Sequence, residues 1–338
     1  MKNKCSCQKS NKNGKCKEAP PPKKLSFTIL DNFKALINYL FLFRKAYSVA
    51  PGLYFTGDKY DKKAPMLVTC NFLLTVLLLF KNLKGRNIRL LIIDTKGINV
   101  WCSAGKGQFS SEEILKVLKS YNKDILTKNE NIEIILPKLS LSGVKLKLLK
   151  KNNVKPIIGP VHMEDIPDYL DMIPYKDSQH DSYKFNVKAR LFTAIPSIMQ
   201  FSKYLILITL IMLFSSIVFK AGFYWQMLVC LLCLTFIYIL LFPFLPGKRF
   251  AVKGISLALF ASMFLFYLYL TSSISIYLTM FYITILIATG IFFGLYYTGN
   301  SAVSNYSKVK QEIITFLPIS FVLYVTAFIF YFIAGDIS

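Results

Sequence analysis

One cysteine lies in a local sequence that favours chemistry at sulfur. Cys102 stands in the segment Asn99-Val-Trp-Cys-Ser-Ala-Gly-Lys-Gly107. Asn is a good helix cap, so Trp101–Ala104 is predicted to form a short helix, which the following glycines end. A helix N-terminus and the nearby Lys106 ammonium both favour thiolate over thiol. Because thiolate is the form that binds a soft or transition metal, Cys102 is a candidate metal ligand.

Two other interpretations of Cys102 stay open at the level of this local pattern. The first is a structural cysteine in a strand-to-helix turn. The second is a thiol nucleophile, but His162 and His180, the two histidines, come without an obvious third partner. A two-cysteine redox motif is excluded locally, because no second cysteine lies within three residues of Cys102.

Three more cysteines lie near the N-terminus. Cys5, Cys7 and Cys16 belong to residues 1–24, a Lys-rich stretch with a short proline run that is predicted to be a flexible tail. They lack the paired CxxC spacing of zinc and iron–sulfur sites, so incidental thiols are favoured over a metal site. No apolar leader precedes them, and we expect the soluble part to face the reducing cytosol, where disulfides are rare.

The elements that must position Cys102 are predicted from alternating apolar and amphipathic runs. Strands are predicted at Met66–Cys70, Arg89–Asp94, Ile132–Leu136 and Val154–Ile158, and helices at Phe72–Leu83, Ser110–Tyr121 and Ser142–Asn152. This alternation indicates a mostly parallel α/β sheet of the Rossmann-like kind. Ligands of such sheets bind beyond the carboxyl ends of the strands. Those ends are Thr69-Cys-Asn71, Asp94-Thr-Lys-Gly97, Pro137 and Gly159-Pro160.

The C-terminal part of the chain is nearly uncharged. Hydrophobic residues make up 54% of the chain, its mean hydropathy is +0.45, and only two acids and six basic residues follow Lys203. Five apolar stretches there are near the roughly 17–25 residues that cross a bilayer. They are Tyr204–Phe219, Phe223–Leu241, Ile255–Leu270, Ile274–Tyr297 and Ile313–Ile333. We therefore predict an all-α domain of five transmembrane helices.

The basic residues of this part gather in two connections, Pro246–Lys253 and Asn300–Lys310. The positive-inside rule puts both, with the N-terminal domain, in the cytoplasm and the C-terminus outside the cell's inner membrane. The predicted spans hold no acid, histidine or arginine, so an anchor is favoured over an ion pathway. Cys230 and Cys233 share one face of the second span, where helix packing is favoured over a metal relay.

The formal net charge of +23 does not indicate nucleic-acid binding. The Lys residues are spread over loops and helix faces, without an aromatic-basic ribbon or a known binding motif. A basic cytoplasmic face beside an anionic membrane explains the same excess. The domain organisation predicted is a tail over 1–24, an α/β domain over 25–171, a linker over 172–203 and a transmembrane domain over 204–338.

The Cys102 segment resembles the cap-helix motif of the mercury-methylating corrinoid proteins. That family is a membrane-anchored relative of the corrinoid iron–sulfur protein large subunit. The similarity runs from about residue 45 to the C-terminus. It includes Tyr47–Tyr54, Pro65–Thr69 with Asn71, Asp94–Asn99, Leu136–Leu139, Gly143, Gly159–Val161, Asp165–Pro167, Pro246–Gly254 and Tyr297–Ser301. Ser103 departs from the family, which usually has Ala directly after the cysteine.

The resemblance implies a corrinoid cofactor, a cobalamin in its base-off form, with Cys102 as the lower axial ligand of cobalt. It also implies which residues line the corrin. These are Thr69, Asn71, Thr95, Asn99, Val100, Trp101, Ser103, Ala104, Gly105, Lys106, Gly107, Gly143, Gly159 and Pro160. The usual free-standing cobalamin signature Asp-x-His-x-x-Gly is absent, which agrees with a cysteine in place of the histidine ligand.

The function implied by the resemblance is that of an anaerobic, corrinoid-dependent methyltransferase. A thiolate trans to the methyl group would favour its transfer from cobalt to Hg(II) with both electrons, giving methylmercury. The implied partners are a ferredoxin-like protein with two [4Fe–4S] clusters and a methyltetrahydrofolate-type methyl donor system. The alternative is a membrane-bound corrinoid methyl carrier of one-carbon metabolism with a different acceptor. A third hypothesis, from another class, is a transporter or scaffold with a regulatory α/β domain.

Overall fold

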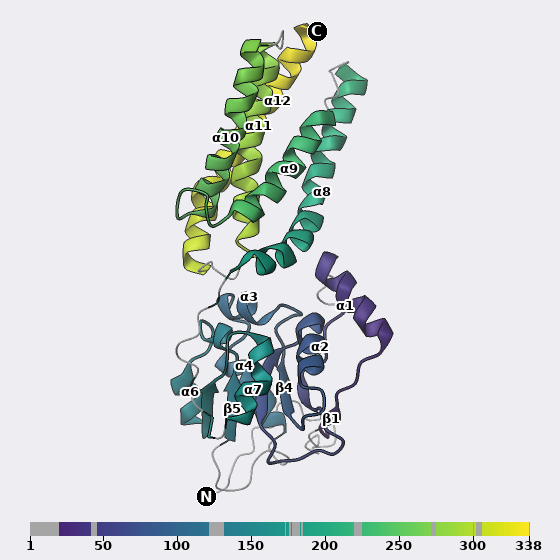
Figure 1. Cartoon of the computed structure of the whole chain (residues 1–338), viewed down its shortest axis with the longest axis vertical. Coiled ribbons are helices and arrows are strands. Elements are labelled where there is room, and N and C mark those ends of the chain that lie inside the picture. Colours follow the sequence, from purple (N-terminus) through teal and green to yellow (C-terminus); the bar gives the residue numbers. More distant parts are fainter. Residues whose placement is uncertain are drawn as a thin grey trace, which may run out of the picture. The chain divides into compact units, whose positions relative to one another are not determined.

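The computed structural model of the chain is drawn in Figure 1. It describes residues 20–41, 46–121, 132–172, 174–175, 177, 183, 185–219, 225–271, 275–299, 301 and 306–337. The chain divides into two compact units. The N-terminal unit is Met1–Leu36 with Arg44–Ser182, and the C-terminal unit is Ile37–Phe43 with Tyr183–Ser338.

A single sheet organises the N-terminal unit, and six strands form it among the described residues. They are β1 (Lys23–Lys24), β2 (Gly52–Phe55), β3 (Met66–Cys70), β4 (Arg89–Ile93), β5 (Ile132–Leu136) and β6 (Val154–Ile158). The spatial order is β1-β2-β4-β3-β5-β6, with β4, β3, β5 and β6 mutually parallel and β2 antiparallel to β4. The four strands predicted from apolar runs are thus confirmed as the parallel part of the sheet.

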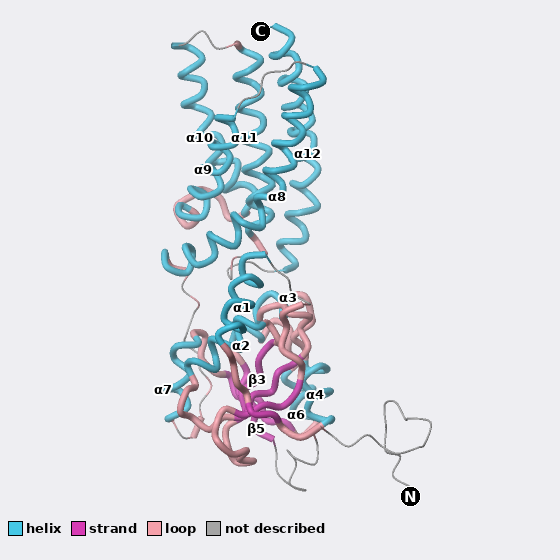
Figure 2. Tube along the Cα trace, turned by 90° about the vertical axis from the view of Figure 1, so that its right-hand side faces the viewer, coloured by secondary structure: helices cyan, strands magenta, loops and turns pink. Residues whose placement is uncertain are grey.

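Helices cover both faces of this sheet (Figure 2). Each face of the sheet has its own hydrophobic core. Successive side chains of β3 enter these two cores alternately, because neighbouring side chains of a strand point to opposite faces. Met66 and Val68 pack with helices α4 (Ser111–Ser120) and α6 (Leu146–Lys151), whereas Leu67 packs with α2 (Leu73–Asn82) and α7 (Ile166–Asp171). The N-terminal unit is therefore a three-layer α/β/α domain.

The strand order fixes where the connections change direction. From β3 the chain passes through α2 to β4 on one side, and β5 and β6 then lie on the other side of β3. The carboxyl ends of β3 and β5 consequently meet at a topological switch point, where ligands of open α/β sheets usually bind.

The C-terminal unit contains five helices among its described residues. They are α8 (Val187–Phe219), α9 (Trp225–Leu241), α10 (Phe250–Thr271), α11 (Ile276–Tyr297) and α12 (Tyr306–Ile337). Four of them, α8, α10, α11 and α12, are long and apolar enough to cross a membrane. The described part of α9 has 17 residues and falls short of that length, so the prediction of five spans holds for four of these helices.

The structure corrects the predicted linker over 172–203. Helix α8 already begins at Val187, so the second half of that stretch is helical. Lys188, Arg190 and Lys203 make this segment look polar in sequence. Its apolar residues nevertheless recur at helical spacing and continue directly into the first span, which is why the helix starts early.

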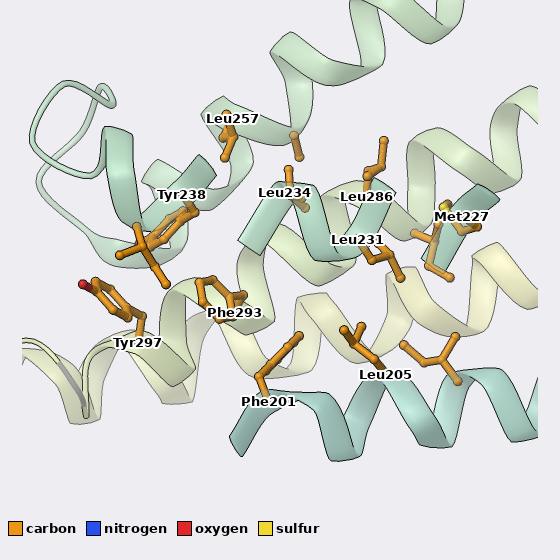
Figure 3. Close-up of a cluster of buried hydrophobic side chains, with 14 of the residues drawn as sticks. Phe201, Leu205, Met227, Leu231, Leu234, Tyr238, Leu257, Leu286, Phe293 and Tyr297 are labelled. Atoms are coloured by element: carbon orange, nitrogen blue, oxygen red, sulfur yellow. The ribbon is translucent and has the colours of Figure 1, made fainter. Parts of the chain in front are cut away.

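Buried aromatic and aliphatic side chains hold the C-terminal helices together (Figure 3). The cluster joins Phe201 of α8, Tyr238 of α9 and Phe293 of α11. Between α10 and α11 the backbones themselves meet, because a Cβ added to Gly290 would lie 2.5 Å from the carbonyl oxygen of Gly254. Close approach through small residues is the usual way that helices associate in a bilayer.

The charged side chains of Glu312 and Lys253 pair with backbone groups near helix ends. Glu312 of α12 is buried, and its Oε1 accepts a hydrogen bond from the backbone N–H of Ala251 at 2.7 Å. The ammonium of Lys253 donates to the carbonyls of Phe242 at 2.8 Å and Leu245 at 2.6 Å. Both side chains therefore satisfy backbone groups that helix ends leave unpaired.

Candidate functional site

The cysteine singled out by sequence lies on a short capped helix. Helix α3 spans Val100–Gly105, and the side chain of Asn99 accepts a hydrogen bond from the Cys102 backbone N–H at 2.9 Å. The capping role predicted for Asn99 is confirmed. The cap fixes the first turn of α3 and, with it, the backbone of Cys102.

Ser103 stabilises the same helix through buried hydrogen bonds. Its hydroxyl is fully buried and donates to the carbonyl of Asn99 at 2.7 Å. Its own carbonyl accepts from the N–H groups of Gln108 at 2.8 Å and Phe109 at 3.1 Å. An alanine here would lack these hydroxyl bonds, so Ser103 adds a connection that an alanine could not make.

Helix α3 lies at the carboxyl edge of the sheet. It follows β4 in sequence, yet it contacts η1 (Lys138–Ser140), which follows β5, and also the end of β3. The segment carrying Cys102 thus crosses over the switch point between β3 and β5. The tertiary structure brings together strand ends that are more than sixty residues apart in sequence.

Asn71 ties this edge together. Its Oδ1 accepts hydrogen bonds from the Thr95 N–H at 3.1 Å, the Thr95 hydroxyl at 2.8 Å and the Gly97 N–H at 2.9 Å. Its Nδ2 donates to Asp94 at 3.1 Å. Lys96, between these partners, has a positive φ of 56°, a conformation that costs energy for a residue with a Cβ. One amide therefore shapes the loop that leads from β4 into α3.

The backbone at Gly143 packs closely against α3. A Cβ at this position would lie 2.7 Å from the Ala104 carbonyl oxygen and 2.9 Å from the Ala104 Cα, and it would also meet the Phe109 carbonyl. Only glycine allows the backbone after η1 to come this close to α3. Gly159 continues the sheet, donating its N–H to the carbonyl of Leu136 at 2.8 Å.

Burial separates the residues predicted to line a cofactor into two groups. Thr69, Asn71, Thr95, Ser103, Ala104, Gly159 and Pro160 are buried within the protein. Asn99, Val100, Trp101, Cys102, Gly105, Lys106, Gly107 and Gly143 are exposed or partly exposed. The buried group stabilises the edge of the sheet. The exposed group, except for Gly143, which packs against α3, offers surface to a ligand.

One polar residue at this edge was not predicted. Gln108 follows α3, and its Oε1 is buried without a hydrogen-bond partner in the part of the chain that the structure describes. A buried acceptor without a donor costs free energy, so it is well suited to a donor from a ligand. Its sequence signal was weak, because Gln108 lies beyond the glycines that end the cap-helix motif.

The side chains at this edge suit a metal that is already held by a macrocyclic cofactor. Among the described residues, no group of three or more His, Cys, Asp or Glu side chains could hold a metal ion. Cys102, partly exposed, offers one soft donor and therefore matches a single axial position. Gln108 offers an acceptor for the amide groups that fringe a corrin ring. The residues present therefore fit a corrinoid.

The second cysteine of this unit has a different character. Cys70, at the end of β3, is fully buried, and burial raises the pKa of its thiol. A buried neutral thiol is inert. Among the described cysteines of this unit, Cys102 is therefore the one that a ligand can reach. Cys230 and Cys233 are exposed on α9, outside the packed faces predicted for them. Cys5, Cys7, Cys16 and His180 lie outside the described residues.

Comparisons with known proteins place a similarity on the same unit. Residues 42–169 match the family model described as CdhD, CO dehydrogenase/acetyl-CoA synthase delta subunit. The chain is 33% identical over 130 residues to the acetyl-CoA decarbonylase/synthase complex subunit gamma of Methanopyrus kandleri. It is 25% identical over 130 residues to subunit gamma 2 of Methanosarcina thermophila.

Each of these two similarities covers 38% of this chain and 27% of the relative. The chain therefore spans about a quarter of the length of the curated relatives it matches. The stretch matched by the family model contains β2 to β6, α3 and Cys102, and it ends before the apolar helices begin. The similarity thus concerns the α/β unit that carries the candidate site.

Proposed function

We propose that this chain is a membrane-bound corrinoid protein that carries a methyl group, with Cys102 as the lower axial ligand of cobalt. One observation carries the proposal. Cys102 stands partly exposed on a capped helix over the switch point of the sheet, within the stretch that resembles subunits of the acetyl-CoA decarbonylase/synthase complex.

The roles of the neighbouring residues follow from their contacts. Asn99 and Ser103 fix the helix that presents the Cys102 sulfur, and Asn71 fixes the loop before it. Gln108 would accept a hydrogen bond from a corrin amide, and the side chain of Lys106 is exposed. The corrinoid supplies the cobalt–methyl bond, and the protein supplies a sulfur ligand and a fixed geometry.

The proposed methyl acceptor is Hg(II), and the product is methylmercury. The support is the resemblance of the Cys102 segment, with Pro246–Gly254 and Tyr297–Ser301, to the mercury-methylating corrinoid proteins. On this proposal a ferredoxin-like protein with two [4Fe–4S] clusters supplies electrons. A methyltetrahydrofolate-type system supplies the methyl group.

A second candidate is a corrinoid methyl carrier of one-carbon metabolism with a different acceptor. The similarity to subunits of a multiprotein complex favours it, because such a carrier would work by meeting partner proteins. Both candidates place the N-terminal unit on the cytoplasmic side of the inner membrane and the C-terminus outside. The basic connections Pro246–Lys253 and Asn300–Lys310 support this orientation.

The test is made on the full chain, produced without oxygen together with a ferredoxin that carries two [4Fe–4S] clusters. Bound corrinoid is measured from the visible spectrum, and methylmercury is measured after Hg(II) is added. The variant is Cys102→Ala, and the matched control is Cys230→Ala, a substitution on α9 outside the proposed site. We expect corrinoid binding and methylmercury from the wild type and the control, and a shifted spectrum without methylmercury from Cys102→Ala.

Three other outcomes would change the proposal. Bound corrinoid without methylmercury from the wild type would favour the one-carbon carrier. An unchanged spectrum in Cys102→Ala would refute the cobalt–sulfur bond. Failure of the purified wild type to bind any corrinoid would refute both candidates and favour the transporter or scaffold hypothesis.

A further inference from the structure

Arg190, in the first turn of α8, is a buried cation whose side chain is only partly paired. Its exposed fraction is 6%. The guanidinium donates to the carbonyl of Phe185 at 3.2 Å, whereas its Nε is buried without a hydrogen-bond partner in the part of the chain that the structure describes. A guanidinium keeps its proton in proteins, so it cannot become neutral when it is buried. A buried cation of this kind is costly unless an anion lies beside it.

The C-terminal unit offers Arg190 almost no anion of its own. Between Tyr183 and Ser338 the sequence has ten Lys and Arg residues and two acids, Glu312 and Asp336. The Glu312 carboxylate accepts from a backbone N–H of α10, and it forms no ion pair with Arg190 among the described residues. Asp336 lies near the far end of α12, about 45 Å along the helix from its first residue. The missing negative charge is therefore expected from a ligand.

The backbone of Arg190 is held against the end of α11. The Thr193 hydroxyl donates to the Arg190 carbonyl at 2.9 Å and lies 3.1 Å from the Tyr297 hydroxyl. The rings of Phe185 and Tyr297 lie 6.4 Å apart between centroids. The Arg190 charge is near enough to the Tyr297 hydroxyl to interact with it electrostatically. All four residues belong to the C-terminal unit, so this arrangement is part of the fold of that unit.

The length of α11 places this end of the unit at a membrane boundary. Helix α11 is long and apolar enough to cross a membrane, and its 22 residues measure about 33 Å. The hydrocarbon core is roughly 30 Å thick, so Tyr297, the last residue of α11, lies where the core meets the headgroups. Tyrosine is enriched at that depth. Arg190, which neighbours Tyr297, is therefore at the level of lipid phosphate groups.

A second polar group without a partner lies at the same end of α11. Ser301, four residues beyond Tyr297, is fully buried, and its hydroxyl has no hydrogen-bond partner among the described residues. Its backbone N–H donates to the Tyr297 carbonyl at 3.1 Å, which keeps Ser301 close to the helix end. Buried polar groups without partners are uncommon in native proteins, and an ion or ligand often explains them. A ligand with several oxygens would satisfy both groups.

The chemistry of a guanidinium favours a particular class of anion. Its planar set of N–H donors matches two oxygens of a phosphate or carboxylate group, and these charge-assisted hydrogen bonds are the strong ones. Phosphate is the oxyanion that a membrane itself supplies at the depth of Tyr297. The basic connection Asn300–Lys310 directly follows this end of α11 and would attract the same anions.

We propose that the C-terminal unit binds a phosphate-type oxyanion at the end of α11, with the anion paired to the Arg190 guanidinium. The phosphate group of an anionic phospholipid and free inorganic phosphate share this chemistry. The site is separate from that of Cys102, and it does not depend on the function proposed there.

The test compares three probes on the full chain, stripped of lipid in a detergent that carries no phosphate. They are phosphatidylglycerol, diacylglycerol with the same acyl chains, and inorganic phosphate. A ligand that binds the folded state raises the thermal unfolding midpoint in proportion to its affinity and concentration. We expect phosphatidylglycerol to raise the midpoint well above the effect of diacylglycerol. A matching rise with inorganic phosphate would identify the free ion as sufficient, and no rise with it would identify a lipid headgroup.

Variants of Arg190 show where the phosphate group binds. Arg190→Gln should weaken the apparent affinity about ten- to a hundredfold, the loss expected from one hydrogen bond to a charged group. Arg190→Lys should keep part of the affinity, because it keeps the charge and loses the planar set of donors. The matched control is Lys188→Gln, which removes an exposed positive charge from the same turn of α8 and should bind as the wild type does.

Stability without ligand separates a binding arginine from a structural one. In the stripped sample Arg190→Gln should unfold no earlier than the wild type, because it removes a buried charge that has lost its anion. Earlier unfolding of Arg190→Gln in that sample would assign Arg190 a structural role and overturn the proposal. Equal midpoint rises with phosphatidylglycerol and diacylglycerol, without a response to inorganic phosphate, would also overturn it. So would equal affinities of Arg190→Gln and the wild type for phosphatidylglycerol.

Discussion

Asn71→Ala is expected to loosen the loop that leads to the cysteine helix. The substitution removes the acceptor of three hydrogen bonds, from the Thr95 N–H, the Thr95 hydroxyl and the Gly97 N–H. Thr95 is fully buried and Gly97 is also buried, so water cannot easily replace the lost acceptor. Two backbone N–H groups left unpaired at about 1–2 kcal/mol each amount to roughly 2–4 kcal/mol.

Amide hydrogen exchange measures this local loss directly. At 1.4 kcal/mol per tenfold, roughly 2–4 kcal/mol corresponds to about 30- to 700-fold faster exchange of the Thr95 and Gly97 amides. The full chain in detergent micelles serves for the measurement, with peptides of α4 and β6 as internal references. The cap helix should exchange faster as well, because Ile98 and Asn99 follow directly on this loop.

Two control variants separate the acceptor from the side-chain volume. Asn71→Asp keeps an oxygen where Oδ1 stands and replaces the donor to Asp94 with a second carboxylate, so it should protect Thr95 and Gly97 better than Asn71→Ala. Asn87→Ala changes an exposed asparagine of the same unit and should leave the loop unchanged. Native-like protection of Thr95 and Gly97 in Asn71→Ala would refute the role assigned to the amide.

Three further predictions concern other parts of the chain. An iodoacetamide-type reagent should alkylate Cys102 in the folded protein and spare Cys70, whose thiol is fully buried and has a raised pKa; labelled peptides show which sulfur reacts. Gly254→Leu should lower the thermal unfolding midpoint in detergent, at a cost of about 3 kcal/mol, because its side chain would meet the backbone of α11. The Arg86 guanidinium holds the pKa of Asp171 below its ordinary value of 3.8, so the small stabilisation from this pair should be present at neutral pH and be lost as pH falls through that lowered pKa; acid unfolding of the wild type against Asp171→Asn measures it.

Each of these predictions has its own control. Denaturant should make Cys70 as reactive as Cys102, and equal labelling in the native state would contradict the assigned burial. Met263→Leu, on the outward face of α10, should leave the unfolding midpoint unchanged. Identical acid unfolding of the wild type and Asp171→Asn would show that the pair, which is exposed to solvent, contributes nothing measurable.

The sequence by itself determined the local helices and strands, and it singled out Cys102 as a candidate metal ligand. Runs of apolar residues set β3, β4, β5 and β6, because buried parallel strands need continuous apolar side chains. Asn99 and Ser110 set the starts of α3 and α4, because a side-chain oxygen at that position pairs a free N–H of the first turn. Long uncharged stretches set the helices of the C-terminal unit, although the onset of α8 lay inside a segment predicted to be a linker.

The tertiary structure decided what depends on residues distant in sequence. Neither β1 nor β2 was predicted, because their pairing requires an edge that only the assembled sheet provides. The need for glycine at position 143 follows from the close contact of its backbone with Ala104, which only the folded chain makes. In the same way, the side-chain oxygen of Gln108 lacks a hydrogen-bond donor only because folding buries it. Local sequence specifies hydrogen bonds within a few residues of one another. The packing of residues distant in sequence decides which groups are buried and which are left to meet a ligand.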